Sequence, residues 1–136
     1  MLTRRTLMTA ATLLLGTFAF ASAAQATDLS GYWEGGWNSC NTGHKGVLKA
    51  DFCRISDTAY QVNFKGRFFK VFPFRYSVVL NVVSDDGQTV RLQGSSYLGR
   101  MFGTFYYNAT VTNGCFNASY TSCKDSGSFR MTKCCD

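Results

Sequence analysis

The stretch AYQVNFKGRF, residues 59–68, carries the clearest fold signal in the chain. Apolar and polar side chains alternate along it, so that Tyr60, Val62 and Phe64 share one face and polar residues occupy the other. Alternation with a period of two is typical of a β-strand that is buried on one side. The stretch therefore predicts a strand with an apolar inner face and a solvated outer face.

The same alternation recurs on both sides of this stretch, with turn residues between the repeats. Asp86-Gly87 and Asn113-Gly114 are dipeptides that favour two-residue hairpin turns. Pro73, the only proline, fits a strand start because it cannot donate a ladder hydrogen bond. No stretch has the periodicity of a helix. Eight strands are predicted, at residues 31–39, 47–54, 59–68, 74–83, 89–96, 101–112, 115–122 and 128–134.

Short connections join these predicted strands, so consecutive strands should pair as antiparallel neighbours in a meander. An open meander leaves two unpaired strand edges, whereas closure into a barrel removes both. The predicted fold class is all-β: an eight-stranded antiparallel up-and-down meander barrel stapled by disulfides, with a β-sandwich as the alternative. Residues 27–136 are enough for one such domain with one core and not for two.

The N-terminal residues 1–26 are predicted to be a signal peptide. Arg4 and Arg5 precede an apolar stretch, and small residues follow it up to Ala26, which is the three-part order of an export signal. The apolar stretch is shorter than the ~20 residues that span a bilayer, so no transmembrane anchor is expected after cleavage. Cleavage is expected after Ala26, with Ala23 as a second site. The arginine pair fits either a bacterial twin-arginine signal or an ordinary basic start, and the mature chain is expected to be periplasmic or secreted.

The charge of the chain is mildly positive. Removal of Arg4 and Arg5 lowers the formal charge from +6 to +4. The remaining cations are scattered among acids except for a cluster that includes Lys65, Arg67 and Arg75. Alternating cations on a strand pair usually mark a solvated face, so nucleic acid is not an expected partner.

Six cysteines fall in the mature part of the chain. An even number in a small exported domain argues for disulfides. Zinc is the competing explanation, but His44 is the only histidine and no two cysteines have zinc-ribbon spacing, so no metal or other cofactor is expected. If the last hairpin turns at Lys124 and Asp125, Cys115 falls opposite Cys134. The predicted pairs are Cys40 with Cys123, Cys115 with Cys134 and Cys53 with Cys135, the alternative being an exchange between Cys134 and Cys135.

The first predicted strand opens with Gly31-Tyr32-Trp33, which resembles the G-x-W signature of lipocalins. Residues 29–50 are also similar to the first hairpin of avidin-type barrels. The resemblance implies a calycin-like small β-barrel, in which a cation on the last strand packs over the tryptophan; Lys133, or alternatively Arg130, matches that cation. The long loop over the lipocalin mouth, the C-terminal helix and the biotin contacts of avidins have no counterpart here, so the ligand does not carry over.

The barrel interior is the first candidate site, for a small and largely apolar ligand. An eight-stranded interior is only just wide enough for side chains or one small ligand, so a packed core is the competing interpretation. Gly66, Gly94 and Gly103, which have the inward phase, would leave space for a ligand. The candidate ligand-binding residues are Trp33, Trp37, Tyr60, Phe64, Tyr76, Phe105, Tyr107 and Tyr120.

An apolar loop after the third predicted strand is the second candidate site. Its residues Phe69, Lys70, Phe72 and Arg75 combine rings with cations, and exposed apolar groups often mark contact with a partner. The chain would then be a secreted inhibitor, an interaction protein or an envelope component that binds an extracytoplasmic protein. The alternative is a loop that folds back over the barrel mouth.

Catalysis is not expected. His44 has no serine or carboxylate at a motif spacing, so a catalytic triad is not indicated. Asp85 and Asp86 are explained by the turn that they form. The sequence therefore predicts a non-catalytic binding protein.

Overall fold

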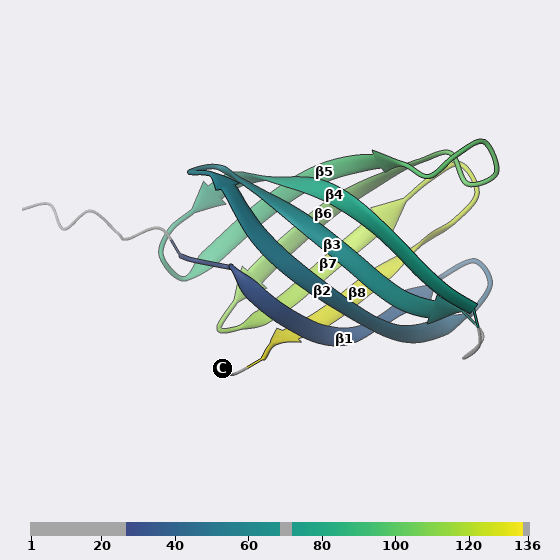
Figure 1. Ribbon diagram of the computed structural model, residues 1–136, viewed down its shortest axis with the longest axis horizontal. Coiled ribbons are helices and arrows are strands. Elements are labelled where there is room, and N and C mark those ends of the chain that lie inside the picture. The colour runs from purple at the N-terminus through teal and green to yellow at the C-terminus, as the bar shows by residue number, and fades with distance from the viewer. Residues whose placement is uncertain (1–26, 69–71, 135–136) are drawn as a thin grey trace, which may run out of the picture.

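The computed structural model describes residues 27–68 and 72–134. These residues form a closed antiparallel barrel in which each strand pairs with its neighbours in the chain and the last strand closes on the first (Figure 1). The strands are β1 (Gly31–Ser39), β2 (Lys45–Ser56), β3 (Ala59–Phe68), β4 (Phe72–Asp85), β5 (Thr89–Tyr97), β6 (Thr104–Thr112), β7 (Cys115–Thr121) and β8 (Ser126–Lys133). The predicted all-β meander barrel is confirmed, and the β-sandwich alternative is wrong. The predicted signal peptide lies outside the described residues, and none of those described belongs to a long apolar helix of the kind that spans a bilayer.

Turn chemistry sets the two hairpins that the sequence marked most clearly. Asn113 and Gly114 have φ values of 51° and 71°, as a two-residue turn between twisted strands requires. At the β4–β5 turn the Asp86 carboxylate accepts a hydrogen bond from the Thr89 amide at 2.6 Å, and Gly87 has a φ of 86°. The Asn113-Gly114 turn sets the β6–β7 register, whereas the β4–β5 register that leaves the Asp86-Gly87 turn shifts by one residue between Val82 and Ser84.

Strand β6 begins at Thr104 rather than at residue 101. Residues before it form a loop in which the Leu98 amide donates to the Gly103 carbonyl at 2.9 Å and the Gly103 amide donates to the Gly99 carbonyl at 2.8 Å. Gly103 has a φ of 72°, a backbone conformation that ends regular strand pairing. It therefore belongs to the loop and leaves no space inside the barrel, contrary to expectation.

The inward side chains form one continuous apolar core. Strand β7 shows the pattern most simply, since exposed and buried residues alternate along its whole length. Rings meet directly inside the barrel: the Phe52 centroid lies 5.3 Å from Trp33, 5.7 Å from Phe116 and 6.1 Å from Tyr60. Each fully buried ring of this kind stabilises the fold by about 1.5–3 kcal/mol.

The segment that precedes β1 closes one end of the barrel, called here the plugged end. Leu29 is only 2% exposed there. Its amide donates to the Tyr60 hydroxyl at 3.2 Å, and its carbonyl accepts from the Trp33 indole at 3.0 Å. The Thr27 amide donates to the Asp85 carboxylate at 2.8 Å. Because its polar backbone groups have partners, this segment can enter the apolar end of the barrel at little cost.

The predicted disulfides are wrong for the cysteines that the structure describes. Across the seam, the Cys40 amide donates to the Ser126 carbonyl at 2.7 Å, so Cys40 faces Ser126 and not Cys123. Cys135, the expected partner of Cys53, lies outside the described residues. The free thiols are those of Cys40, Cys53, Cys115, Cys123 and Cys134.

The register of the last hairpin explains the error at Cys115. Cys115 pairs with Thr132, two residues short of Cys134. The hairpin turns one residue earlier than expected, because the Ser122 hydroxyl accepts hydrogen bonds from two backbone amides of the turn, at 3.0 and 3.2 Å. A cross-strand disulfide needs directly opposed residues, and this offset removes that geometry. The barrel seam is held by the backbone pairing of β1 with β8.

Candidate ligand-binding site

The two ends of the barrel are sealed differently. The connections β5–β6 and β7–β8 lie at the end opposite the plug, which we call the tyrosine end after Tyr76, Tyr107 and Tyr120 (Figure 1, right). Phe74 and Tyr76 are only partly buried there, whereas Leu29 at the plugged end is almost fully buried. The tyrosine end is therefore the end through which a small molecule could reach the interior.

Tyr76 is the centre of a stack of aromatic rings. Its centroid lies 5.2 Å from Phe64, 5.9 Å from Phe74 and 6.5 Å from Tyr107, with interplanar angles of 25°, 22° and 20°. Offset stacking of nearly parallel rings at such distances is favourable. The stack presents flat apolar faces of the kind that would contact a flat aromatic molecule.

Hydroxyl groups accompany these rings. The Tyr107 and Ser96 hydroxyls form a hydrogen bond of 3.0 Å, and the Tyr120 hydroxyl donates to the Asp125 carboxylate at 3.0 Å. Burial raises the pKa of Tyr76 and of Tyr107. Burial, followed by the bond to Asp125, raises the pKa of Tyr120. All three phenols therefore stay neutral at physiological pH and can act as hydrogen-bond donors.

Glycines do leave space inside the barrel, but apolar side chains take it. A Cβ atom on Gly66 would lie 2.5 Å from Cζ of Phe74, and one on Gly94 would lie 2.8 Å from Cδ2 of Leu80. The interior is thus packed by rings and aliphatic groups in the described state. A ligand at the tyrosine end would have to displace a side chain, and Phe74 is a partly buried one.

The residues predicted to bind a ligand are divided between the two ends. Trp33 and Tyr60 belong to the plugged end, where both bond to Leu29. The Trp37 ring meets Phe74 edge-on, with centroids 6.4 Å apart. The residues brought together at the tyrosine end are Phe64, Tyr76, Phe105, Tyr107 and Tyr120, and Phe129 joins them between Phe64, Tyr107 and Tyr120.

The predicted partner loop lies mostly beyond the described structure. Phe69 and Lys70 fall outside the described residues, and so does the side chain of Phe72. Arg75 is exposed on β4. The described flanks of this loop, at the end of β3 and the start of β4, reach the tyrosine end.

The cations matched to the lipocalin pattern both lie outside the core. Lys133 is exposed at the plugged end, where its ammonium donates to the Asp28 carbonyl at 3.3 Å. Arg130 is exposed on the outer face of β8 and donates from Nε to Asn117 at 3.0 Å. His44 is exposed in the β1–β2 turn, and over the described ranges no three His, Cys, Asp or Glu side chains gather as metal ligands would.

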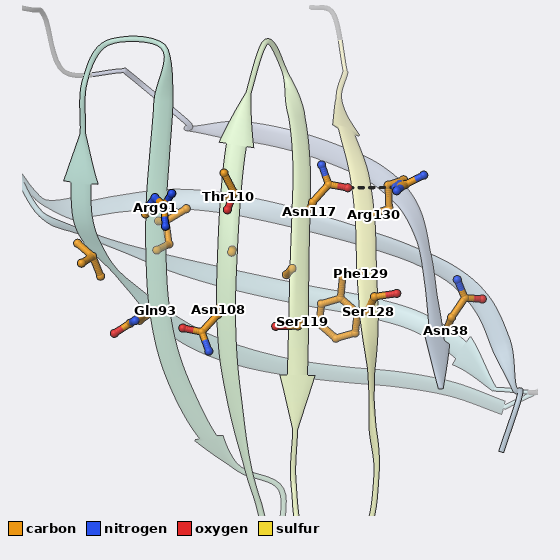
Figure 2. Close-up of a pocket in the computed structure, with 14 residues that line it drawn as sticks. Asn38, Arg91, Gln93, Asn108, Thr110, Asn117, Ser119, Ser128, Phe129 and Arg130 are labelled. Atoms are coloured by element: carbon orange, nitrogen blue, oxygen red, sulfur yellow. Dashed lines mark hydrogen bonds between the residues drawn. The ribbon is translucent and has the colours of Figure 1, made fainter. Parts of the chain in front are cut away.

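Sequence reasoning missed two hollows on the outside of the barrel. The larger, of about 710 Å³, lies over β5 to β8 and reaches Asn38 of β1 (Figure 2). The smaller, of about 580 Å³, lies over β1 and β2 and reaches Arg67 of β3 and Arg130 of β8. Outward polar residues line much of the larger hollow, whereas glycines, Trp37 and Val47 form most of the wall of the smaller one. In the sequence, outward polar residues look like any solvated strand face. The available signal was the run of Gln, Asn and Ser at matching outward positions of neighbouring strands.

Comparison with known proteins supports the fold and no family. No protein-family model matches the chain, and no curated protein sequence matches it. The structure is similar to a de novo designed fluorescence-activating β-barrel, with 14% identity, a TM-score of 0.56, and coverage of 82% of this chain and 99% of that one. It is also similar to a redesigned barrel, mFAP1, bound to DFHBI, with 12% identity, a TM-score of 0.57, and coverage of 78% and 94%. The barrel implied by the lipocalin-like opening is therefore present, while membership of the calycins is not shown.

Proposed function

We propose that this chain is an exported, non-catalytic protein that binds a small, flat and largely apolar molecule at the tyrosine end of its barrel. The observation that carries the proposal is the stack formed by Phe64, Phe74, Tyr76 and Tyr107 at the less buried end. Barrel mouths lined by rings with a few convergent polar groups are common ligand sites. The redesigned barrel mFAP1 and the structurally similar EF1p2_mFAP2b are both bound to DFHBI, which supports the idea that this architecture can carry a small molecule.

The ligand would replace the Phe74 ring and stack on Tyr76. Phe74 fills the space above Gly66 and is only partly buried, so its displacement costs less than that of a core ring. The neutral hydroxyls of Tyr107 and Ser96 would then contact one polar edge of the ligand. An anionic ligand fits poorly, because the charged group described beside these rings is the Asp125 carboxylate, which accepts a hydrogen bond from Tyr120.

Native mass spectrometry of the chain purified from the exported fraction tests the proposal. Wild-type protein should carry a molecule of small mass, and Tyr76→Leu should carry about tenfold less because ring stacking is lost. Tyr106→Leu is the matched control, since Tyr106 is a tyrosine on the outer face of β6. Bare wild-type chains, or equal occupancy in wild type and Tyr76→Leu, would contradict the proposal.

A second candidate function is contact with an extracytoplasmic protein through the loops of the tyrosine end. Met101 and Phe102 in the β5–β6 loop are 71% and 48% exposed, and exposed apolar loop residues often mark a binding surface. Capture of a protein from culture supernatant should be lost in the double variant Met101→Ser/Phe102→Ser. The control is Ile55→Ser/Val83→Ser, which removes two exposed apolar side chains away from this loop. Equal loss of capture in both variants would exclude this candidate.

A further inference from the structure

The larger outer hollow contains a row of amide and hydroxyl side chains that crosses five adjacent strands of the barrel wall (Figure 2). Each member is the register partner of the next, so the row follows the direction of the backbone hydrogen bonds. Neighbouring strands are about 4.8 Å apart, which sets the spacing of the polar groups. In order from β5 to β1 the row is Gln93, Asn108, Ser119, Ser128 and Asn38.

These side chains have unused hydrogen-bonding capacity. Within the described part of the chain, none of the five side chains in the row has a hydrogen-bond partner. An amide offers two donor hydrogens and an acceptor oxygen, and a serine hydroxyl both donates and accepts. The row therefore presents both donors and acceptors on every strand that it crosses, which suits a ligand that itself carries many hydroxyl groups.

A second row runs parallel to the first and adds positive charge (Figure 2). It consists of Arg91, Thr110, Asn117 and Arg130, which are again consecutive register partners. The bond of 3.0 Å from Arg130 to Asn117 orients one guanidinium along the hollow. Because a guanidinium can donate two parallel bonds to a carboxylate or sulfate, this row supplies anion contacts beside the hydroxyl contacts.

The two hollows join into one trough. Asn38 and Arg130 line both of them, and the smaller hollow continues over Gly35, Gly36 and Gly46, where the wall has no side chains. From β5 to β2 the trough crosses six strands and follows the curved wall of the closed barrel, an arc of roughly 24 Å at the usual strand spacing. That length fits an extended chain better than a single small molecule.

The charge of the trough is one-sided. Arg91 and Arg130 line the larger hollow, and Lys45, Arg67 and Arg130 line the smaller one, while no Asp or Glu is found among the described residues that line either. An anionic ligand would meet no repulsive carboxylate along the wall. Positive lining of this kind also accelerates the approach of an anion and makes binding sensitive to salt.

An exposed ring stands beside the polar row. Tyr106 is 57% exposed and lies two residues from Asn108 on the same face of β6, in register with Ser95 and Thr121. A flat ring can cover the C–H face of a sugar while neighbouring amides bond to the hydroxyl edge. Single-stranded nucleic acid would instead need several stacking rings along the groove, and only this exposed ring borders the row within the described structure.

We propose that the trough binds an acidic oligosaccharide, a polyhydroxylated chain that carries carboxylate or sulfate groups. The amide and hydroxyl row holds the sugar hydroxyls, Arg91 and Arg130 hold the acidic groups, and Tyr106 stacks on one sugar ring. The side chains proposed to hold the sugar point outward from the strands whose inward side chains form the core, so they differ from those of the interior site, although Phe129 borders both.

Isothermal titration with hexagalacturonate at low salt tests the proposal. Wild-type protein should bind it about tenfold more tightly than neutral maltohexaose, and the difference should shrink in high salt. Equal binding of both hexasaccharides, or no binding of hexagalacturonate, would overturn the proposal. Tighter binding of the oligonucleotide dT12 than of hexagalacturonate would assign the trough to nucleic acid and would overturn it as well.

Variants separate this surface from the general charge of the protein. Gln93→Ala/Asn108→Ala should weaken hexagalacturonate binding about tenfold, since two bonding side chains are lost. Gln61→Ala/Asn63→Ala is the matched control on the outer face of β3 and should bind as wild type does. Equal weakening in both double variants, with unchanged circular dichroism, would refute the location of the site. Tyr76→Leu should leave hexagalacturonate binding unchanged, which separates a failure of this proposal from a failure of the interior site.

Discussion

Gly66→Ala offers a direct test of how tightly the tyrosine end is packed. The new methyl group would lie 2.5 Å from Cζ of Phe74 and 2.6 Å from the backbone oxygen of Val47, both well inside van der Waals contact. Overpacking of this kind costs about 1–3 kcal/mol. Loss of a glycine from the unfolded chain returns about 0.4–1 kcal/mol. The expected net loss in the free energy of unfolding is therefore about 1–2 kcal/mol.

Urea unfolding followed by tryptophan fluorescence measures this loss, because Trp33 and Trp37 are the only tryptophans and both are buried. Phe74→Ala should by itself cost about 2 kcal/mol, roughly half the value for a fully buried ring. In the double variant Gly66→Ala/Phe74→Ala the new methyl group enters the space that the ring has left, so the combined loss should fall below the sum of the single losses by about 0.5–1.5 kcal/mol. Strictly additive losses, or a Gly66→Ala variant as stable as wild type, would refute the packing argument.

Three further predictions concern stability and chemistry. Leu29→Ala should lower the free energy of unfolding by about 2–5 kcal/mol in the same urea assay, because a fully buried plug residue is truncated; a loss close to zero would show that the plug is not part of the folded core. Backbone hydrogen bonds from Thr89 and Gln88 lower the folded pKa of Asp86, so its contribution to stability is present above the unfolded pKa of about 3.9 and is lost as pH falls towards the folded value; Asp86→Asn should flatten the acid side of the stability–pH curve, and an unchanged curve would contradict this. The exposed thiols of Cys40, Cys53, Cys115 and Cys123 should react with a disulfide reagent in the native protein. Addition of a reductant should not change the midpoint of urea unfolding. Unreactive thiols in the native state would contradict the assignment of these cysteines as free.

The sequence predicts most of this fold because its strands are half-buried. Strand β3 has the expected bounds, since Tyr60, Val62 and Phe64 leave only one register that buries all three side chains. The turn at Asn113 was equally clear from its dipeptide. The register predicted for the last hairpin was wrong because its turn depends on hydrogen bonds to the Ser122 side chain. Such bonds leave no periodic pattern in the sequence from which they could be predicted.

The sites were harder to predict than the strands. The inward phase of Tyr76 and Tyr107 was readable, but whether rings enclose a ligand or one another depends on how Phe74 fills the space beside Gly66. The outer trough was not predicted at all, because Gln93 and Asn108 lie far apart in the sequence and become neighbours only through the β5–β6 register. Polar side chains on an outer face can be recognised as a candidate site only once the strand register shows that they are neighbours.

The plug also ties folding to processing of the chain. If the leader is cut after Ala26, the amide nitrogen of Thr27 that donates to the Asp85 carboxylate at 2.8 Å becomes a charged terminal ammonium, and the hydrogen bond becomes an ion pair. A cut after Ala23 would keep an uncharged amide at that point and leave three extra residues at the mouth of the plug. The cleavage site would then decide how strongly the segment before β1 is held at the plugged end of the barrel.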